Sequence, residues 1–256
     1  MSFKNFIKYL IPVTLFAGLP TLGLADGHGG LDPKDAVGIS FWIISIAMVA
    51  ATAFFFLESL RFSGKWRTSM VVGGLVTLVA AVHYFYMRDV WASGGGSPTV
   101  YRYVDWIVTV PLQMVEFYLI LAACTAVAGG VFWRLFIGSL VMLIAGYLGE
   151  AGMINATIGF VVGMAGWIYI LYEIFAGEAG KISAADAPAS VQSAFNTMRW
   201  IVTIGWAIYP LGYFLGYLAG GTDAATMNLI YNVADVLNKI GFCLAVWACA
   251  SAESKA

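Results

Sequence analysis

Five ionisable residues stand inside the most apolar runs of this sequence, and their types are those that bind and pass protons. They are Arg102, Asp105, Glu116, Asp235 and Lys239. A charged side chain at the centre of a membrane helix costs about 2.5–3.5 kcal/mol, so such residues must pair with one another or line a polar cavity. A static cluster of ion pairs that only joins helices would meet this requirement, and so would a path for protons across the membrane.

The spacing of these residues favours the proton path. Asp105 and Glu116 are eleven residues apart, which is close to three helical turns, so both lie on nearly one face and about 16 Å apart along the axis. Asp235 and Lys239 are four residues apart and share a face of a second helix. By depth, we expect Asp105, Asp235 and Arg102 on the outer side of Lys239 and Glu116 on its inner side.

Lys239 is also a candidate nucleophile. Desolvation in an apolar site favours the neutral amine of a lysine, which can form a Schiff base with a carbonyl compound. Aromatic residues at a similar depth could enclose a long, flat, apolar group attached to this amine; they are Trp106, Trp167, Trp206 and Tyr209. Plain packing is the commoner role for aromatic residues at helical spacing, and that alternative stays open.

Histidine and cysteine, which can bind protons or metals, also occur in the apolar runs. His83 lies about 12 Å from the outer end of its segment, level with Asp105, and could hydrogen-bond to that carboxylate. A core histidine with no such role is the alternative. Cys124, Cys243 and Cys249 lack the spacing of metal ligands, and we interpret them as small buried apolar residues. We therefore expect no metal site.

The composition predicts which elements position these residues. Of the 256 residues, 61% are hydrophobic and 11% are charged, and the mean hydropathy is +0.85, whereas a soluble domain carries about 25% charged residues. The net charge of −1 indicates no nucleic-acid partner. Apolar segments of about 20 residues can cross a bilayer as helices. We predict an all-α membrane protein with seven transmembrane helices, over residues 36–61, 67–91, 99–123, 131–149, 152–176, 195–219 and 226–251.

The first 25 residues predict a signal peptide rather than a further helix. Two lysines precede a short apolar stretch that two prolines interrupt, and the small residues of "GLA" follow. This order is typical of a secretory leader and its cleavage site. An additional N-terminal anchor is the alternative. We expect residues 1–25 to be removed, which leaves 26–256 as one seven-helix domain.

Lysines and arginines in the links predict the orientation in the membrane. One side carries Lys34 and Arg88, and the opposite side carries the remainder of those near the helix ends: Arg61, Lys65, Arg67, Arg134, Lys181, Arg199 and Lys255. The side richer in these residues is cytoplasmic. We therefore expect a multi-pass protein of a bacterial inner membrane, with its N-terminus outside and its C-terminus in the cytoplasm.

Several motifs resemble those of the microbial (type I) rhodopsins. They are "RYVDW" and "TVP" with Glu116 on the third segment, "WAIYP" on the sixth and "DVLNKIGF" on the seventh. The resemblance covers all seven segments and implies a microbial rhodopsin-like bundle. A glutamate at position 116, the histidine level with Asp105 and the secretory leader are more similar to bacterial proteorhodopsin than to archaeal bacteriorhodopsin.

The resemblance implies a role for each ionisable residue. Lys239 would carry all-trans retinal as a protonated Schiff base. Asp105 would be the counterion and primary proton acceptor, Asp235 a second counterion, and Arg102 would tune both. Glu116 would return a proton from the cytoplasmic side. The implied function is light-driven outward proton pumping, which makes the protein an ion transporter rather than an enzyme.

The resemblance also implies what surrounds the retinal. His83 would pair with Asp105. Gln113 occupies the family's spectral-tuning position, where glutamine rather than leucine is similar to the blue-absorbing members. The side chains implied to line the chromophore are Trp106, Trp167, Trp206, Tyr209 and Tyr213. Homo-oligomers, as pentamers or hexamers, are typical of this family and are the implied assembly.

Two alternative functions stay open, and one feature of the sequence departs from the pattern of bacteriorhodopsin-like pumps. A photosensor that signals to a membrane transducer is the first alternative, and Glu116 favours a pump over it. A seven-helix transporter or receptor without a chromophore is the second. The departure concerns proton release: bacteriorhodopsin-like pumps place paired glutamates at the outer ends of segments six and seven, and here "AGGTDAATMN" offers only Asp223.

Overall fold

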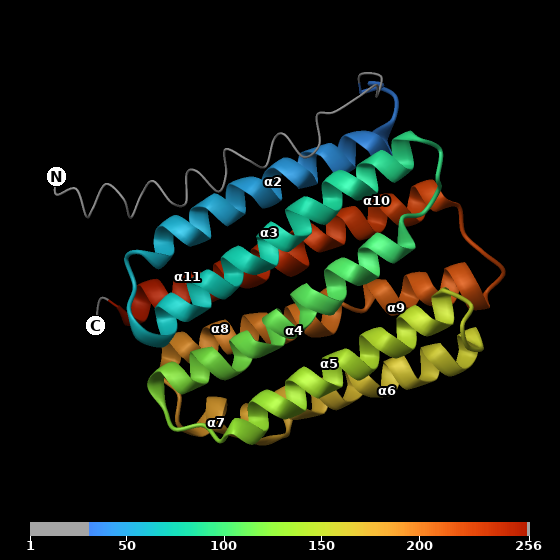
Figure 1. Ribbon diagram of the computed structural model, residues 1–256. Coiled ribbons are helices and arrows are strands. Elements are labelled where there is room, and N and C mark those ends of the chain that lie inside the picture. The colour runs from blue at the N-terminus through green and yellow to red at the C-terminus, as the bar shows by residue number, and fades with distance from the viewer. Residues whose placement is uncertain (1–30, 255–256) are drawn as a thin grey trace, which may run out of the picture.

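Residues 31–254 are described by the computed structural model, and they form a bundle of long helices that run alongside one another (Figure 1). Seven helical stretches in this part are long and apolar enough to cross a membrane, which confirms the predicted fold class. The predicted signal peptide lies outside the described residues, so it stays a prediction.

The first four spans are single helices, and the last three are each composed of several helical pieces. The single helices are α2 (Ala36–Ser59), α3 (Gly64–Ala92), α4 (Thr99–Cys124) and α5 (Gly129–Glu150). The fifth span is α6 (Ala156–Phe175) followed by α7 (Glu178–Ala185). The sixth joins α8 (Ala189–Trp200), η2 (Ile201–Gly205), α9 (Ile208–Tyr213) and η3 (Phe214–Leu218), and the seventh joins α10 (Ala224–Asp235), η4 (Val236–Gly241) and α11 (Phe242–Glu253).

Short polar residues begin several of these helices by accepting hydrogen bonds from otherwise free backbone N–H groups. The Asp35 side chain accepts from the Gly38 N–H at 2.9 Å, and it also accepts from the Trp91 indole at 3.0 Å. Asn155 caps α6 and Asp223 caps α10 in the same way. Asp35 therefore both starts α2 and joins it to the end of α3.

The predicted boundaries were wrong where the fifth span leads into the sixth. The predicted spans 152–176 and 195–219 leave the residues between them outside any helix, but α7 lies there, and the sixth span begins at Ala189 rather than at 195. Hydropathy marks only the most apolar part of each helix. The helices continue past this apolar part. Pro188 is the residue immediately before α8, a position where a proline is well tolerated.

Three π-helical segments interrupt the last two spans: η2, η3 and η4. Segments of this kind are rare and often mark functional sites. The Asn238 amide in η4 donates a hydrogen bond to the Gly205 carbonyl in η2 at 3.0 Å. The two segments therefore hold the sixth and seventh spans together next to Lys239, which lies in η4.

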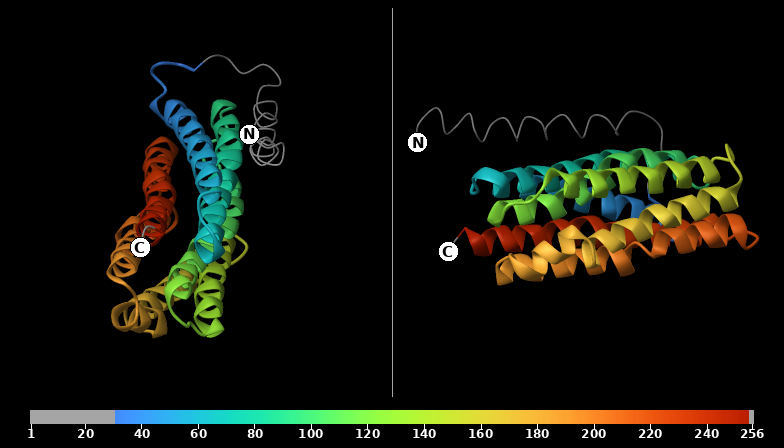
Figure 2. Two further views of the ribbon diagram at one scale, coloured as in Figure 1. Left: turned by 90° about the vertical axis from the view of Figure 1, so that its left-hand side faces the viewer. Right: turned by 90° about the horizontal axis from the view of Figure 1, so that it is seen from below.

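Large apolar side chains cover the outer surface of the bundle, as expected of a protein surrounded by lipid. Ile204, Leu237 and Trp133 are each more than half exposed, at 67%, 62% and 57%. An aqueous surface would rarely carry so many contiguous apolar groups. Figure 2 shows from two further directions that the spans are packed side by side along their length. Polar and charged residues are correspondingly found between the helices, where the site lies.

Candidate functional site

Lys239 lies between two buried aspartates. Its Nζ donates hydrogen bonds to Asp105 Oδ2 of α4 and, at 3.0 Å, to Asp235 Oδ2 one turn earlier in its own span. All three side chains are almost completely buried. A buried ammonium group is tolerated only where opposite charges and hydrogen bonds replace its water. The geometry therefore brings together Lys239 and the two aspartates that the depth argument placed on its outer side.

The two aspartates differ in how firmly they are held. Asp235 accepts hydrogen bonds from the Tyr84 hydroxyl at 2.8 Å and from the Tyr209 hydroxyl at 2.5 Å, in addition to Lys239. Asp105 accepts from Lys239, and its Oδ1 has no hydrogen-bond partner among residues 31–254. Donors stabilise the ionised form of a carboxylate. Asp105 is therefore the carboxylate that is more available to accept a proton.

Arg102 belongs to the same buried layer but faces a different set of partners. Its Nη2 donates to Asn228 Oδ1 and to Asn232 Oδ1, both at 2.8 Å. The guanidinium also lies over the Tyr231 ring, at 5.3 Å from its centre. Within the described residues it forms no salt bridge with Asp105 or Asp235, whose ion pairs are with Lys239. The asparagines hold Arg102 on the outer side of the two aspartates.

An apolar cavity extends from Lys239 between α4, α5, α6 and α9. All the predicted chromophore-lining residues contribute to its wall: Trp106, Gln113, Trp167, Trp206, Tyr209, Tyr213 and Lys239. Gly146, Gly159 and Gly163 also line it. A cavity lined by a lysine, several aromatic rings and glycines fits a long, flat, apolar aldehyde bound to that lysine. The residues present therefore fit retinal.

Hydrogen bonds hold several wall residues in place. Gln113 Nε2 donates to the Asn238 carbonyl at 2.6 Å, next to Lys239 in the chain. The Trp167 indole donates to the Val202 carbonyl at 3.0 Å, and the Tyr213 hydroxyl donates to the Ala156 carbonyl at 2.8 Å. Each bond joins two spans, so the cavity has fixed walls.

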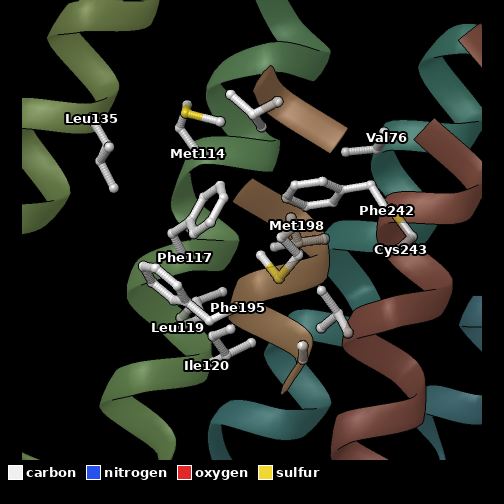
Figure 3. Packing of buried hydrophobic residues seen from close by; sticks show 14 of the residues in the cluster. Val76, Met114, Phe117, Leu119, Ile120, Leu135, Phe195, Met198, Phe242 and Cys243 are labelled. Atoms are coloured by element: carbon white, nitrogen blue, oxygen red, sulfur yellow. The ribbon is translucent and has the colours of Figure 1, made fainter. Parts of the chain in front are cut away.

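Glu116 lies apart from this polar layer, in the inner half of α4. It is buried, and neither of its carboxyl oxygens has a hydrogen-bond partner in the described part of the chain. The Ser69 hydroxyl lies beside it. The neighbouring core is apolar: Phe117 packs against Phe195 and Phe242 with ring centres 5.0 and 5.8 Å away (Figure 3). A lone carboxyl group in such surroundings can store a proton.

His83 is the predicted site residue for which the structure gives the least support. Its Nδ1 lies 2.9 Å from the Val79 carbonyl, one turn earlier in α3, and no hydrogen bond joins it to Asp105 within residues 31–254. Its pairing with Asp105 therefore stays a prediction.

Sequence reasoning missed several residues of this site. Tyr84 donates to Asp235, Asn228 and Asn232 accept from Arg102, and Asn238 donates to the Tyr209 hydroxyl at 3.1 Å. Glu150 accepts a hydrogen bond from the Tyr103 hydroxyl at 2.7 Å. Asn228 and Asn232 could have been found, because positions 228, 232, 235 and 239 recur at helical spacing and form one polar face. Tyr84 had no comparable signal among thirteen tyrosines.

The comparisons with known proteins agree with this arrangement. Residues 35–252 match the family described as bacteriorhodopsin-like protein. The chain is 53% identical to a green-light absorbing proteorhodopsin of Gamma-proteobacterium EBAC31A08, over 97% of this chain and 99% of that protein. It is 52% identical to a blue-light absorbing proteorhodopsin of Gamma-proteobacterium Hot 75m4, over 96% of this chain and 98% of that protein.

Solved structures give the same result. The crystal structure of blue light-absorbing proteorhodopsin from Med12 is 51% identical and superposes with a TM-score of 0.74, covering 86% of this chain and 100% of that one. The chain therefore belongs to the bacteriorhodopsin-like family of seven-helix membrane proteins.

Proposed function

We propose that this protein is a light-driven outward proton pump of the proteorhodopsin type, with retinal bound covalently to Lys239. The observation that carries the proposal is the position of Lys239 between a carboxylate that can take a proton and a separate carboxyl group that can supply one. Family membership supports it as well, since the relatives are proteorhodopsins. The protein is accordingly an ion transporter and not an enzyme.

Retinal, when bound, supplies absorption of visible light and a change of shape on excitation. The rest of the mechanism belongs to the chain. Asp105 takes the proton from the Lys239 nitrogen through the hydrogen bond that already joins them. Asp235 stays ionised because three donors hold it, and it preserves a negative charge near Lys239 during the transfer.

The inward supply of a proton depends on Glu116. The apolar residues around it exclude water, so a proton held there does not exchange freely with either side. Return of that proton to the Lys239 nitrogen completes a cycle in which one proton leaves outward. Moving one charge against the membrane potential requires about 2.3 kcal/mol per 100 mV, which is far below the energy of a visible photon.

We further propose blue absorption, because Gln113 lies at the cavity wall and holds the Asn238 carbonyl next to Lys239. The proposed setting is a bacterial inner membrane, with a cleaved leader over 1–25, the N-terminus outside and a pentamer or hexamer as assembly. An absorption maximum near that of green members would contradict the spectral proposal without affecting the pump.

The decisive experiment is expression with all-trans retinal and illumination of an unbuffered cell suspension while its pH is recorded. The proposal predicts a coloured protein and acidification of the medium in light, abolished by a protonophore. Lys239→Ala is expected to lose both colour and acidification, whereas Lys181→Ala, which changes a lysine at the cytoplasmic end, keeps both. Colour without acidification would favour the photosensor, and no colour would favour a transporter without a chromophore.

A further inference from the structure

We propose that two asparagines of α10, Asn228 and Asn232, position Arg102 without neutralising it. This asparagine pair keeps the positive charge of the guanidinium on the outer side of Asp235 after Lys239 has given up its proton. The inference rests on the proposed pump, because it concerns the moment after that transfer. Neither asparagine is among the residues that line the chromophore cavity, so both are positioning residues that act through Arg102.

Direct contacts from two helices define the position of the guanidinium. Arg102 Nη2 donates to the side-chain oxygens of Asn228 and Asn232, each at 2.8 Å. Both asparagines are completely buried, and Arg102 is only 2% exposed. The guanidinium also lies 5.6 Å from the centre of the Phe41 ring and 5.3 Å from that of Tyr231, distances at which an arginine and an aromatic ring attract each other. Arg102 is therefore held from both α2 and α10.

Ser40 of α2 fixes which end of the Asn232 amide faces Arg102. The Ser40 hydroxyl donates to the Val37 carbonyl at 2.7 Å, and its oxygen accepts from Asn232 Nδ2 at 2.9 Å. An amide side chain donates only through its nitrogen and accepts only through its oxygen. Because the nitrogen of Asn232 donates to Ser40, its oxygen faces the guanidinium. The first span therefore contributes to the orientation of Arg102.

The asparagine pair satisfies a donor of Arg102 without supplying a negative charge. An aspartate at either position would form an ion pair with the guanidinium, whereas an amide oxygen is neutral. Among the residues that the structure describes, Arg102 and Lys239 are the cationic side chains that are buried. Asp105 and Asp235 each form their ion pair with Lys239. The charge of Arg102 is therefore available to act on these carboxylates at longer range.

This charge matters most when the proton moves from Lys239 to Asp105. In that step an N–H bond of Lys239 breaks and an O–H bond forms on Asp105, and no electrons are exchanged. Both groups are then neutral, while Asp235 stays ionised in a buried site, which is costly unless a cation is near. Arg102 supplies that cation. Because the asparagine pair keeps the guanidinium away from Asp105, it does not stabilise the ionised form of the acceptor and oppose the transfer.

The first test asks whether the contact exists in the unchanged protein. The protein is labelled with ¹⁵N-arginine and ¹³C-asparagine, bound to all-trans retinal in liposomes and studied by solid-state NMR. We expect a cross-peak between guanidinium nitrogens and asparagine side-chain carbons that Arg102→Gln removes. The exposed hydrogen bond from Arg199 to Asn196 gives a separate cross-peak that should persist. The absence of any cross-peak that depends on Arg102 would exclude the proposed contact.

Two substitutions of Asn232 should shift the visible band in opposite directions. Asn232→Leu removes one acceptor, so the guanidinium should move toward Asp105 Oδ1, which has no hydrogen-bond partner in the described part of the chain. The negative charge beside Lys239 is then weakened, and the band should move to longer wavelength. Transfer to Asp105 should also become about tenfold slower in transient absorption, since a nearby arginine stabilises the ionised acceptor. Asn232→Asp keeps Arg102 in place and adds a negative charge, so the band should move to shorter wavelength.

The outer side of Arg102 offers a competing outcome. Arg102 lines a second cavity, of about 190 Å³, outward of the chromophore cavity, and Glu150 contributes a carboxyl group to its wall. If the guanidinium of Asn232→Leu moved outward to Glu150, the band would move to shorter wavelength, as in Asn232→Asp, and the proposal would be wrong. Asn196→Leu is the matched control. Asn196 also accepts a hydrogen bond from an arginine, at 2.8 Å on the exposed surface, and its loss should change neither the band nor the transfer.

A double substitution separates positioning from a purely structural role. If Asn232 acts only through Arg102, Asn232→Leu should have no further effect on the band or the transfer rate in the Arg102→Gln background. Ser40→Ala should give the changes of Asn232→Leu at smaller size, and it serves as the milder variant if the leucine variant does not bind retinal. Equal effects in both backgrounds would overturn the proposal. Failure of the unchanged protein to export protons would instead overturn the pump, whereas the cross-peak and the band report on the resting protein.

Discussion

The outer and inner halves of the bundle handle buried polar groups in opposite ways. In the outer half, Arg102, Asp235 and Lys239 are joined to asparagines, tyrosines and Asp105 by direct hydrogen bonds, and a second cavity continues toward the surface. In the inner half, Glu116 has no hydrogen-bond partner in the described part of the chain, and the adjacent Phe117 packs against Phe195 and Phe242. A connected polar layer lets a proton move outward, whereas an isolated carboxyl group in an apolar core holds one back.

This difference gives the transport its direction. In the proposed pump, a proton that leaves Lys239 is taken up by Asp105, whose Oδ1 has no hydrogen-bond partner among the described residues. On the other side of Lys239, the proton that Glu116 is proposed to supply would have to cross the apolar cluster that includes Phe117 (Figure 3). The apolar cluster with Glu116 and the hydrogen-bonded layer with Asp105 therefore lie on opposite sides of the Lys239 amine. Each half can be tested by a substitution of its carboxyl group.

The largest effect is expected from Asp105→Asn, which removes the acceptor of the outer half. Light-dependent acidification should disappear, because an amide cannot take the proton from Lys239. The visible band should move to longer wavelength, since the negative charge beside the nitrogen is lost. Acidifying the unchanged protein until Asp105 is protonated should produce the same shift, and Asp105→Asn should no longer respond. A variant that still pumps would exclude Asp105 as the acceptor.

The next effect concerns the inner half. Glu116→Gln should slow the recovery of the resting state by a factor of about 10²–10⁴, the usual contribution of a positioned proton donor. The colour should stay nearly unchanged, because Glu116 is not among the residues that line the chromophore cavity. Transient absorption measures both quantities. Recovery as fast as in the matched variant Glu178→Gln would mean that another group supplies the proton.

The depth of each residue in the membrane could be predicted from the sequence, but the rotation of each helix could not. Helix lengths and depths were predictable, because a bilayer fixes how many residues cross it and places each residue along one axis. That one coordinate was enough to place Asp105 and Asp235 on the outer side of Lys239. It could not give the rotation of each helix about its axis or its neighbours, so Tyr84 was missed as the partner of Asp235 and Glu150 as the partner of Tyr103.

The irregular backbone was equally beyond prediction. The π-helical segment η4 carries Lys239, yet no residue type in "VLNKIG" distinguishes it from an ordinary helical turn. Such segments are stabilised by their partners, here by the bond from Asn238 to the Gly205 carbonyl of a different span. The partners of Arg102 could not be predicted for a related reason, because packing brings two asparagines within reach of its guanidinium.

A third prediction tests the apolar barrier through packing. Phe117→Ala leaves a cavity where three aromatic rings meet, and the cost should lie near the lower end of the roughly 3–5 kcal/mol found for buried phenylalanines, because lipid rather than water surrounds the bundle. Unfolding in denaturing detergent, followed by loss of the visible band, measures it. Phe214→Ala is the control, since that ring is 45% exposed to the surroundings, and equal costs would contradict a packed inner half.

The smallest effect is expected from Tyr84→Phe, which removes one of the three donors that hold Asp235 in the outer half. A hydrogen bond to a charged group contributes about 1.5–3 kcal/mol, so the same unfolding assay should show a loss in that range. Pumping should persist, because Tyr209 and Lys239 still hold the carboxylate. Tyr86→Phe, at a hydroxyl on a side chain that is 44% exposed, should cost far less. If Tyr84→Phe abolished pumping while Asp235 stayed ionised, the hydroxyl would belong to the proton path itself, and the outer half would be a relay from Asp235 as well as from Asp105.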